Sequence, residues 1–318
     1  MDGLRGEQGS LAALLPEAQL GKIDRIEPIT VGLSGAAVYA ITASRGAFVL
    51  RVQPSADAAT FAQRLLVLRR AAEIGVTPAV VHVDDPARAT VTVRVQGPPL
   101  PAALADPAQR ERALGSLVDR LRAVHALDPT GINDSDPLGH VRTTWQQQHT
   151  RAGFPSWAQS LPATFEAIAA LLAGDTRRAV SHNDVNPMNV IWDGFRAWLL
   201  DWDVAGIGHP HYDLATLAMF LRLDDAAAFE LAARHDGAPL DDRQRATFRA
   251  LRQLVAVLCG LTFLSISEDL GARLAPTLQD APSLGDCYGA MRTGKLDLSG
   301  AHGRTSFGLA LLAEGLPR

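Results

Sequence analysis

The stretch "SHNDVNPMNVIWDGFRAWLLDWD", residues 181–203, decides the fold. It sets polar side chains at both ends of a segment that is otherwise rich in Val, Ile, Trp and Leu: Asp184, Asn189, Asp201 and Asp203. Burying carboxylates is costly unless something compensates their charge. A cation bound between these side chains is one such compensation.

The middle of this stretch predicts a β-hairpin, because "NVIWD" and "AWLLD" flank a turn that begins with Asp193-Gly194, a strong hairpin signal. With a three-residue loop, Asn189 lies directly opposite Asp201, at about 4.5–5.5 Å between Cα atoms. A two-residue loop shifts the register by one position and leaves the two residues neighbours. Asp203, two residues further on in an extended segment, is expected to point the same way as Asp201.

Oxygen ligands of this kind suit Mg²⁺ much better than zinc, so Asn189 and Asp201 are candidate metal ligands. Asp184 lies five residues before Asn189, on the loop that enters the hairpin. A carboxylate at that place can orient a substrate hydroxyl and accept its proton, which makes Asp184 the candidate catalytic residue.

The pattern from His182 to Asn189 is H-x-D-x-x-x-x-N, and with a strand-turn-strand and Asp201 it has the spacing of the kinase catalytic loop and metal-binding Asp. The continuation "LLDWDVAGIGHPHYDLATLAMFL" resembles the aminoglycoside phosphotransferase and choline kinase-like family. An Asp-Trp-Asp sequence replaces the Asp-Phe-Gly of protein kinases, and a Pro-x-x-Asp-Leu-Ala segment begins the next helix. The resemblance spans roughly residues 26–225 and is most specific from 181 to 216.

The resemblance implies an α+β, two-lobed protein kinase-like fold in which Asp184 is the catalytic carboxylate. Asn189 and Asp201 would hold Mg²⁺ between the nucleotide phosphates, and Asp203 would help at a second metal position. The residues that would hold the loop by hydrogen bonds, without chemical roles, are His182 and Asp213.

A change from strand-forming to helix-forming patterns along the sequence also indicates two lobes. Residues 26–95 read mainly as β-branched runs with one helix over residues 57–74, and the later chain reads mainly as helices. The prolines of "QGPPLPAALADP" cannot continue a β-ladder. We therefore predict an antiparallel-sheet lobe over residues 1–96 and a mainly helical lobe over residues 97–318, with a ligand site at their junction.

The nucleotide site is expected in the first lobe. "TVGLSGAAVY" places Ser34 and Gly35 where the family has its flexible nucleotide loop, and Gln96, at the linker, is assigned to the same site. Neither of the two lysines is in a position to bind the phosphates, so Arg51 of "FVLRV" is expected to do so, since a guanidinium can bind phosphate bidentately.

Arg51 lacks the acidic partner that the family carries on the following helix, because that position falls on Arg64. Several alternatives are open: Arg51 pairs with another carboxylate, or Arg51 and Arg64 together clamp phosphate. The candidate carboxylates are Asp57, Glu73 and Asp201.

The composition limits the kinds of partner that the protein is expected to bind. The formal net charge is −4 and the chain has no dense Lys/Arg block, which argues against nucleic acid. The two cysteines have no metal or disulfide spacing, the N-terminus lacks the apolar core of a signal peptide, and the apolar run 254–266 is too short to span a bilayer. We predict a cytoplasmic protein without a membrane partner, in which that run is a buried core helix.

The predicted reaction is Mg²⁺-dependent transfer of the γ-phosphoryl group of ATP, or of GTP, to a hydroxyl of a small molecule. The acceptor stays open: charges after residue 209 are nearly balanced, and no Trp lies beyond residue 202 to form an aromatic cage. The Arg64 departure prompts one alternative, a non-catalytic nucleotide-binding module. A second is a metal-dependent hydrolase, whose residues would be His182, Asp184, Asp201, His209 and His211.

Overall fold

The computed structural model describes residues 11–29, 36–268, 270–271 and 273–316 of the chain. It divides into two compact units. Unit 1 consists of Met1–Asn133 and Ala179–Ile207, and unit 2 consists of Asp134–Arg178 and Gly208–Arg318. The predicted lobe boundary at residue 96 stays a prediction.

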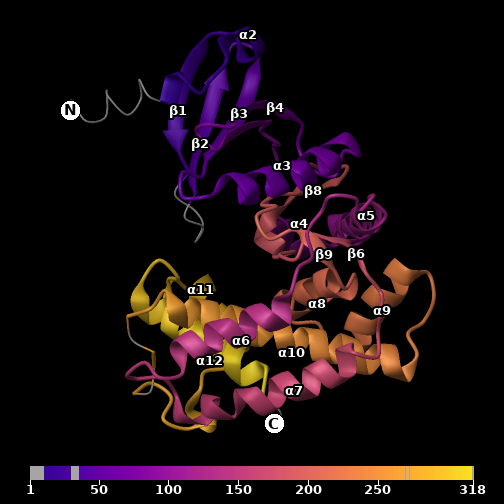
Figure 1. Cartoon of the computed structure of the whole chain (residues 1–318), viewed down its shortest axis with the longest axis vertical. Helices are drawn as coiled ribbons and strands as arrows, with labels where there is room; N and C mark the ends of the chain where they lie inside the picture. The colour runs from indigo at the N-terminus through magenta and orange to yellow at the C-terminus, as the bar shows by residue number, and fades with distance from the viewer. Residues whose placement is uncertain (1–10, 30–35, 269, 272, 317–318) are drawn as a thin grey trace. The chain divides into compact units, whose positions relative to one another are not determined.

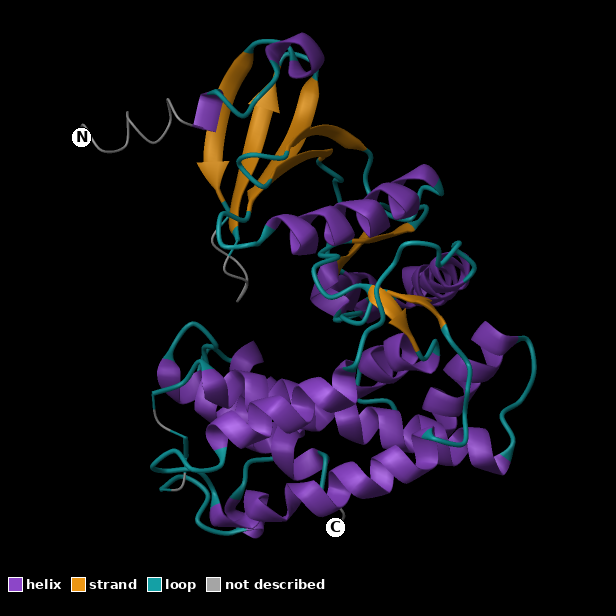
Figure 2. Cartoon of the chain, viewed as in Figure 1, coloured by secondary structure: helices purple, strands orange, loops and turns teal. Residues whose placement is uncertain are grey.

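Unit 1 contains a five-stranded antiparallel sheet with the strand order β1-β2-β3-β5-β4 (Figures 1 and 2). The short helix α2 (Glu17–Leu20) precedes the sheet. The strands are β1 (Ile23–Pro28), β2 (Ala37–Ala43), β3 (Gly46–Val52), β4 (Val80–Asp84) and β5 (Ala89–Val93). The antiparallel sheet expected from the β-branched runs is confirmed.

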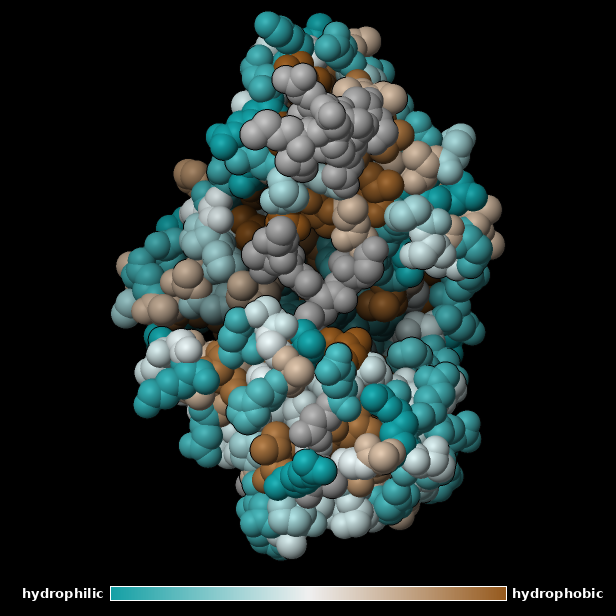
Figure 3. Space-filling view, turned by 90° about the vertical axis from the view of Figure 1, so that its left-hand side faces the viewer, coloured by the Kyte–Doolittle hydropathy of each residue, from teal (hydrophilic) through white to brown (hydrophobic). Residues whose placement is uncertain are grey.

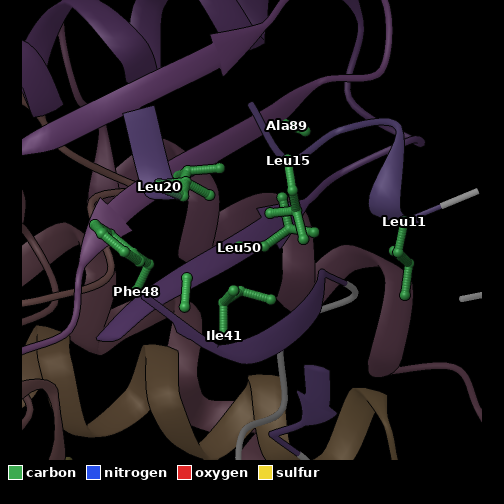
Figure 4. Packing of buried hydrophobic residues seen from close by; sticks show 9 residues of the cluster. Leu11, Leu15, Leu20, Ile41, Phe48, Leu50 and Ala89 are labelled. Atoms are coloured by element: carbon green, nitrogen blue, oxygen red, sulfur yellow. The ribbon is translucent and has the colours of Figure 1, made fainter. Parts of the chain in front are cut away.

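A cluster of buried apolar side chains packs on one side of this sheet and fixes which way β3 faces (Figure 4). Phe48 and Leu50 of β3 belong to the cluster, together with Leu11 and Leu20 from the chain before the sheet. Successive side chains of a strand alternate between its faces. Arg51 therefore projects away from the apolar cluster, to the side where a polar site can form.

The helix predicted over residues 57–74 is confirmed as α3 (Ala58–Glu73). Asp57 caps it by accepting a hydrogen bond from the Thr60 backbone N–H at 2.9 Å. The spacing of Phe61, Leu65, Leu68 and Ala72 in the sequence predicts one apolar face, and this prediction is half right. Phe61 and Leu65 are buried, but the buried face continues through Val67 and Ala71. Leu68, Ala72 and the neighbouring Arg64 are each partly buried.

The rest of unit 1 carries the segment that decides the fold. Its helices are α4 (Leu100–Ala105), α5 (Pro107–His125) and the 3-10 turn η2 (Pro187–Asn189). Its short strands are β6 (Ala179–Ser181), which pairs with β9 (Gly206–Gly208, at the boundary with unit 2), and β7 (Val190–Trp192), which pairs with β8 (Ala197–Leu199).

The β7–β8 hairpin is fastened to the elements around it. The Ala197 N–H donates to Ser116 Oγ of α5 at 3.0 Å, and the Trp192 N–H donates to the Pro98 carbonyl at 3.0 Å. Gly97 has φ +144°, and a Cβ there would lie 2.2 Å from the Trp192 carbonyl oxygen, so only glycine fits. These contacts fix the hairpin against the linker and α5.

Unit 2 is helical. Its elements are α6 (Pro137–Gln148), η1 (Ser156–Ser160), α7 (Leu161–Leu172), α8 (His211–Phe220), α9 (Asp225–Asp236), α10 (Asp242–Ser265), η3 (Leu278–Asp280), α11 (Leu284–Arg292) and α12 (Ala301–Glu314). The central helix α10 contacts α6, α7, α8 and α12.

Helix α10 contains the apolar run that the sequence predicts to be a core helix. In the described part of the chain it is the one helix long and apolar enough to cross a membrane by length and composition, and 61% of its most apolar window is buried inside the protein. Figure 3 shows one face of the molecule, whose lower half is mainly hydrophilic with small separate apolar patches. The burial confirms the prediction of a core helix.

Candidate active site

The β7–β8 hairpin has a two-residue turn, so the three-residue loop that would place Asn189 opposite Asp201 is wrong. The Asp193 N–H donates to the Arg196 carbonyl at 3.2 Å, and Trp192 pairs with Ala197. The Asp193 side chain selects this turn, because its Oδ1 accepts the backbone N–H groups of Phe195 and Arg196 at 2.8 and 2.7 Å.

The tighter turn keeps the expected residues adjacent. The Leu200 N–H donates to the Asn189 carbonyl at 2.8 Å, so Asn189 lies across from the residue just before Asp201. This is the one-residue shift that a two-residue loop produces. Asp201 itself has φ +65°, a left-handed conformation that Asp tolerates better than most residues and that is found in excess at functional sites.

Buried His182 ties the two ends of the segment together. Its Nδ1 accepts the Asp184 backbone N–H at 3.3 Å, and its Nε2 lies 2.9 Å from the Leu200 carbonyl. This pair of contacts matches a neutral imidazole with its proton on Nε2. The ring also packs on Trp202, with 4.5 Å between centroids. Such contacts suit the holding role that the resemblance implies.

Asp184 and Asn189 form a direct pair. The Asn189 Nδ2 donates to Asp184 Oδ2 at 2.8 Å and to the Asp184 carbonyl at 3.2 Å. The turn between them is η2, capped by the Asn186 side chain, which accepts the Met188 N–H at 3.0 Å. With the Asn189 nitrogen committed to Asp184, the atom that remains for a cation is its amide oxygen.

Arg51 joins the sheet to this segment. Its Nη1 donates to Asp201 Oδ1 at 2.9 Å, and its Nη2 donates to Asp203 Oδ2. One guanidinium therefore binds both carboxylates, which confirms that Asp201 and Asp203 point the same way. Of the carboxylates considered as partners of Arg51, Asp201 is the one found. Asp203 is a second partner, and the D-x-D spacing in the sequence is the signal that places its carboxylate on the same side as that of Asp201.

Asp203 is also held by Gln53 and Arg64. Gln53 Nε2 donates to Asp203 Oδ2 at 2.8 Å, and Arg64 Nε donates to the Asp203 carbonyl at 3.0 Å. Burial raises the pKa of Asp203, and the charges of Arg51 and Arg64 oppose that shift. Burial thus disfavours the ionised form of Asp203, and the neighbouring guanidinium groups favour it.

The structure says less about the other residues that are predicted to bind the nucleotide. Gln96 is exposed in the segment that follows β5, and Ser34 and Gly35 lie outside the described residues. Their binding roles stay predictions.

Two of the three histidines of the hydrolase hypothesis, His209 and His211, lie in unit 2, each beside a carboxylate, whereas His182 lies in unit 1. His209 Nε2 lies 3.0 Å from Asp175 Oδ2, and His211 Nε2 lies 2.9 Å from Asp236 Oδ2. Arg177 bonds to Asp175 and holds the pKa of that carboxyl well below its usual range. Burial lowers the pKa of His209 to about 4, so its ring is neutral in ordinary buffers.

A group of possible metal ligands in unit 2 is already occupied by the guanidinium of Arg177. His211, His235 and Asp236 bring one ligand atom each within 4.8 Å of one another. Arg177 Nη1, however, lies 3.2 Å from His211 Nε2 and 3.3 Å from Asp236 Oδ2. The guanidinium already supplies positive charge at that place.

The unit 1 atoms fit a magnesium–nucleotide complex. The candidate ligands, Asn189 and Asp201, offer only oxygen, as Mg²⁺ prefers. Among the described residues, only Arg51 donates to the Asp201 carboxylate, which leaves its second oxygen for a cation. The Arg51 Nε is buried without an acceptor in the described part of the chain, and a phosphate oxygen would satisfy it.

Comparison with protein-family models shows the family to which the chain belongs. Residues 25–254 match the model of the phosphotransferase enzyme family, so the chain belongs to that family. This confirms the resemblance to aminoglycoside phosphotransferases and choline kinases. A search of curated protein sequences finds no match.

Solved structures then show the particular relatives. A choline/ethanolamine kinase family protein from Mesorhizobium loti is 18% identical, covers 97% of this chain and 99% of its own, and has a TM-score of 0.68. A choline kinase from Streptococcus pneumoniae is 14% identical, with coverage of 86% and 94% and a TM-score of 0.65. An aminoglycoside phosphotransferase from Streptomyces rimosus is 20% identical, with coverage of 78% and 98% and a TM-score of 0.53. The predicted α+β, protein kinase-like fold is thereby confirmed.

Proposed function

We propose that the protein is a magnesium-dependent phosphotransferase that moves the γ-phosphoryl group of a nucleoside triphosphate to a hydroxyl group of a small molecule. The observation that carries this proposal is the pairing of Asp184 with the Asn189 amide nitrogen, which leaves the amide oxygen for a cation beside the Arg51–Asp201 ion pair. Family membership supports the same reaction class.

Each residue has a distinct task in this scheme. Asp184 accepts a hydrogen bond from the acceptor hydroxyl and takes its proton as the oxygen attacks the γ-phosphorus and the bond to the leaving nucleoside diphosphate breaks. Asn189 fixes the orientation of Asp184 through its Nδ2. Asn189 and Asp201 would hold magnesium, which when bound neutralises phosphate charge. Arg51 donates to phosphate oxygens from its Nε and from the guanidinium hydrogens that Asp201 and Asp203 do not use.

We further propose that ATP, or GTP, is the donor and that the protein acts in the cytoplasm. Support for nucleotide binding comes from similar solved structures: one, of a protein named LicA, is a complex with AMP, and the Streptomyces rimosus enzyme was solved with ADP and streptomycin. Choline-like amino alcohols and aminoglycosides, the compounds in the names of these relatives, are the first acceptors to screen.

Two variants test the assignment. Asp184→Ala should abolish turnover on any acceptor found by an ADP-release screen and should leave MgATP affinity within about twofold, because the lost group acts on the hydroxyl. Asp201→Ala should damage both turnover and Mg²⁺-dependent nucleotide binding. Asp119→Ala, an exposed site on α5, is the matched control and should change neither quantity. Turnover retained by Asp184→Ala would rule out the catalytic assignment.

The same experiments separate the proposal from a non-catalytic module. Such a module would bind nucleotide with the unmutated site yet transfer no phosphoryl group to any acceptor, and Asp184→Ala would then have no phenotype.

A further inference from the structure

The Asp203 carboxylate is held by side chains of three residues. Its Oδ2 accepts hydrogen bonds from Arg51 Nη2 and from Gln53 Nε2, and Arg64 Nη1 lies 3.9 Å from the same oxygen. Arg64 Nε also donates to the Asp203 carbonyl at 3.0 Å. Donors from the end of β3 and from α3 thus converge on one residue, whose side chain is 24% exposed.

Helix α3 supplies no carboxylate for Arg51. Its one acidic residue is Glu73, which is exposed at its last position. The side chain of α3 that reaches this site is the cationic Arg64. It binds Asp203 and does not pair with Arg51. A guanidinium keeps its orientation only where acceptors match its fork.

We propose that Asp203 is the positioning residue of Arg51, the counter-ion that holds the guanidinium ready for the nucleotide phosphates, and that it is not a metal ligand. The proposal rests on the proposed function, in which Arg51 binds phosphate. At this contact the cation, Arg64, lies on helix α3, and the anion, Asp203, follows strand β8. Arg64 and Gln53 keep Asp203 in place, and Asp203 keeps Arg51 in place.

The contacts explain why the two neighbouring carboxylates take different roles. A cation at Asp203 Oδ2 would have to displace Gln53 and the guanidinium of Arg51, and it would meet the charge of Arg64. Within the described residues, Asp201 receives one donor, on Oδ1. The Asp203 carboxylate accepts from Arg51 and Gln53 and lies 3.9 Å from the Arg64 guanidinium, so more of its negative charge is already compensated than that of Asp201. The less compensated carboxylate, Asp201, is therefore the better ligand for Mg²⁺.

The test is a double-mutant cycle on MgATP affinity, measured by calorimetry with Arg51→Gln, Asp203→Asn and the double variant. Loss of a charge-assisted hydrogen bond costs about tenfold or more in affinity, so each single variant should bind about tenfold more weakly. Since Asp203 acts through Arg51, the double variant should also lose about tenfold, far less than the roughly hundredfold that independent effects would give.

Magnesium dependence provides the readout that a merely structural role would not reproduce. The Mg²⁺ concentration that half-saturates ATP binding should change less than about twofold in Asp203→Asn and should rise about tenfold or more in Asp201→Asn, because only the latter removes a ligand. The matched controls are Asp119→Asn and Arg122→Gln, a surface ion pair of α5 in the same unit, which should leave both quantities unchanged.

A milder variant covers the possibility of misfolding. Gln53→Ala removes one donor to Asp203 and changes no charge, and it should weaken MgATP binding by roughly twofold to fivefold. That loss should vanish in the Asp203→Asn background. Additive losses in the cycle, or a raised Mg²⁺ requirement in Asp203→Asn, would overturn the inference. If the unmutated protein bound neither MgATP nor MgGTP, the proposed function would fall first and the inference with it.

Discussion

His209 should make the protein sensitive to mild acid. Its side chain is 11% exposed, its Nε2 lies 3.0 Å from Asp175 Oδ2, and its Nδ1 accepts the His211 backbone N–H at 3.1 Å. Burial lowers its pKa from the ordinary 6.5 to about 4. Because the folded-state pKa is depressed, the neutral ring stabilises the fold fully above the unfolded pKa. That stabilisation is lost as the pH falls from 6.5 toward 4.

The size of the effect follows from the shift. One pKa unit corresponds to about 1.4 kcal/mol, so the whole window is worth on the order of 3 kcal/mol, and about 2 kcal/mol of it is lost between about pH 7 and pH 5. Asp175 and Asp236 contribute in the same direction, since their pKa values are also held below the usual range by their partners. Those carboxyls titrate below the ordinary Asp value of 3.8, however, and so add little above pH 5.

His209→Asn isolates this contribution. The Asn amide oxygen can still accept the His211 N–H, but the side chain no longer titrates. Urea unfolding followed by far-ultraviolet circular dichroism at about pH 7, 6 and 5 should show the variant losing about 2 kcal/mol less than the unmutated protein across this range. The exposed His302→Asn is the control and should keep the original pH slope. Equal slopes for His209→Asn and the unmutated protein would refute the reasoning.

Two further predictions concern the scaffold of the site. Gly97→Ala should cost several kcal/mol of stability, since its Cβ would lie 2.2 Å from the Trp192 carbonyl oxygen, whereas Gly237→Ala, at φ +75° with nothing within 4 Å, should cost only about 1–2 kcal/mol. Equal thermal shifts would contradict the close approach. Asp193→Ala should lose roughly 1–3 kcal/mol, because Asp193 accepts from Phe195 N–H, Arg196 N–H and Trp198 Nε1. Urea unfolding beside the exposed Asp119→Ala tests this, and a loss no greater than the control would count against the turn assignment.

The sequence predicts the elements of this fold well because their signals are local. Asp57 and Gly75 bound α3 through a side-chain cap and a left-handed residue, both of which depend on near neighbours. The apolar face of α3 was half wrong for the opposite reason: which of Val67 and Leu68 is buried depends on what packs against the helix, and periodicity alone does not specify that neighbour.

The site shows the same division. The order of Asp184, Asn189 and Asp201 could be read as a motif, but the hairpin register depended on the Asp193 side chain, which caps a two-residue turn. The partners of Arg51 are 150 and 152 positions away from it in the sequence, so no pattern around Arg51 itself could select Asp203 over Asp57. Long-range charge pairing needs the fold before it can be assigned.

The measurement that tests the central claim most directly is a calorimetric titration of the purified protein with ATP and with GTP, each with and without Mg²⁺. The proposed site predicts saturable binding of at least one nucleotide that depends on magnesium, because Asn189 and Asp201 offer their free oxygens to the cation that the phosphates share. Saturable binding that is indifferent to magnesium would indicate a nucleotide sensor. Absence of binding by both nucleotides would contradict the phosphotransferase assignment.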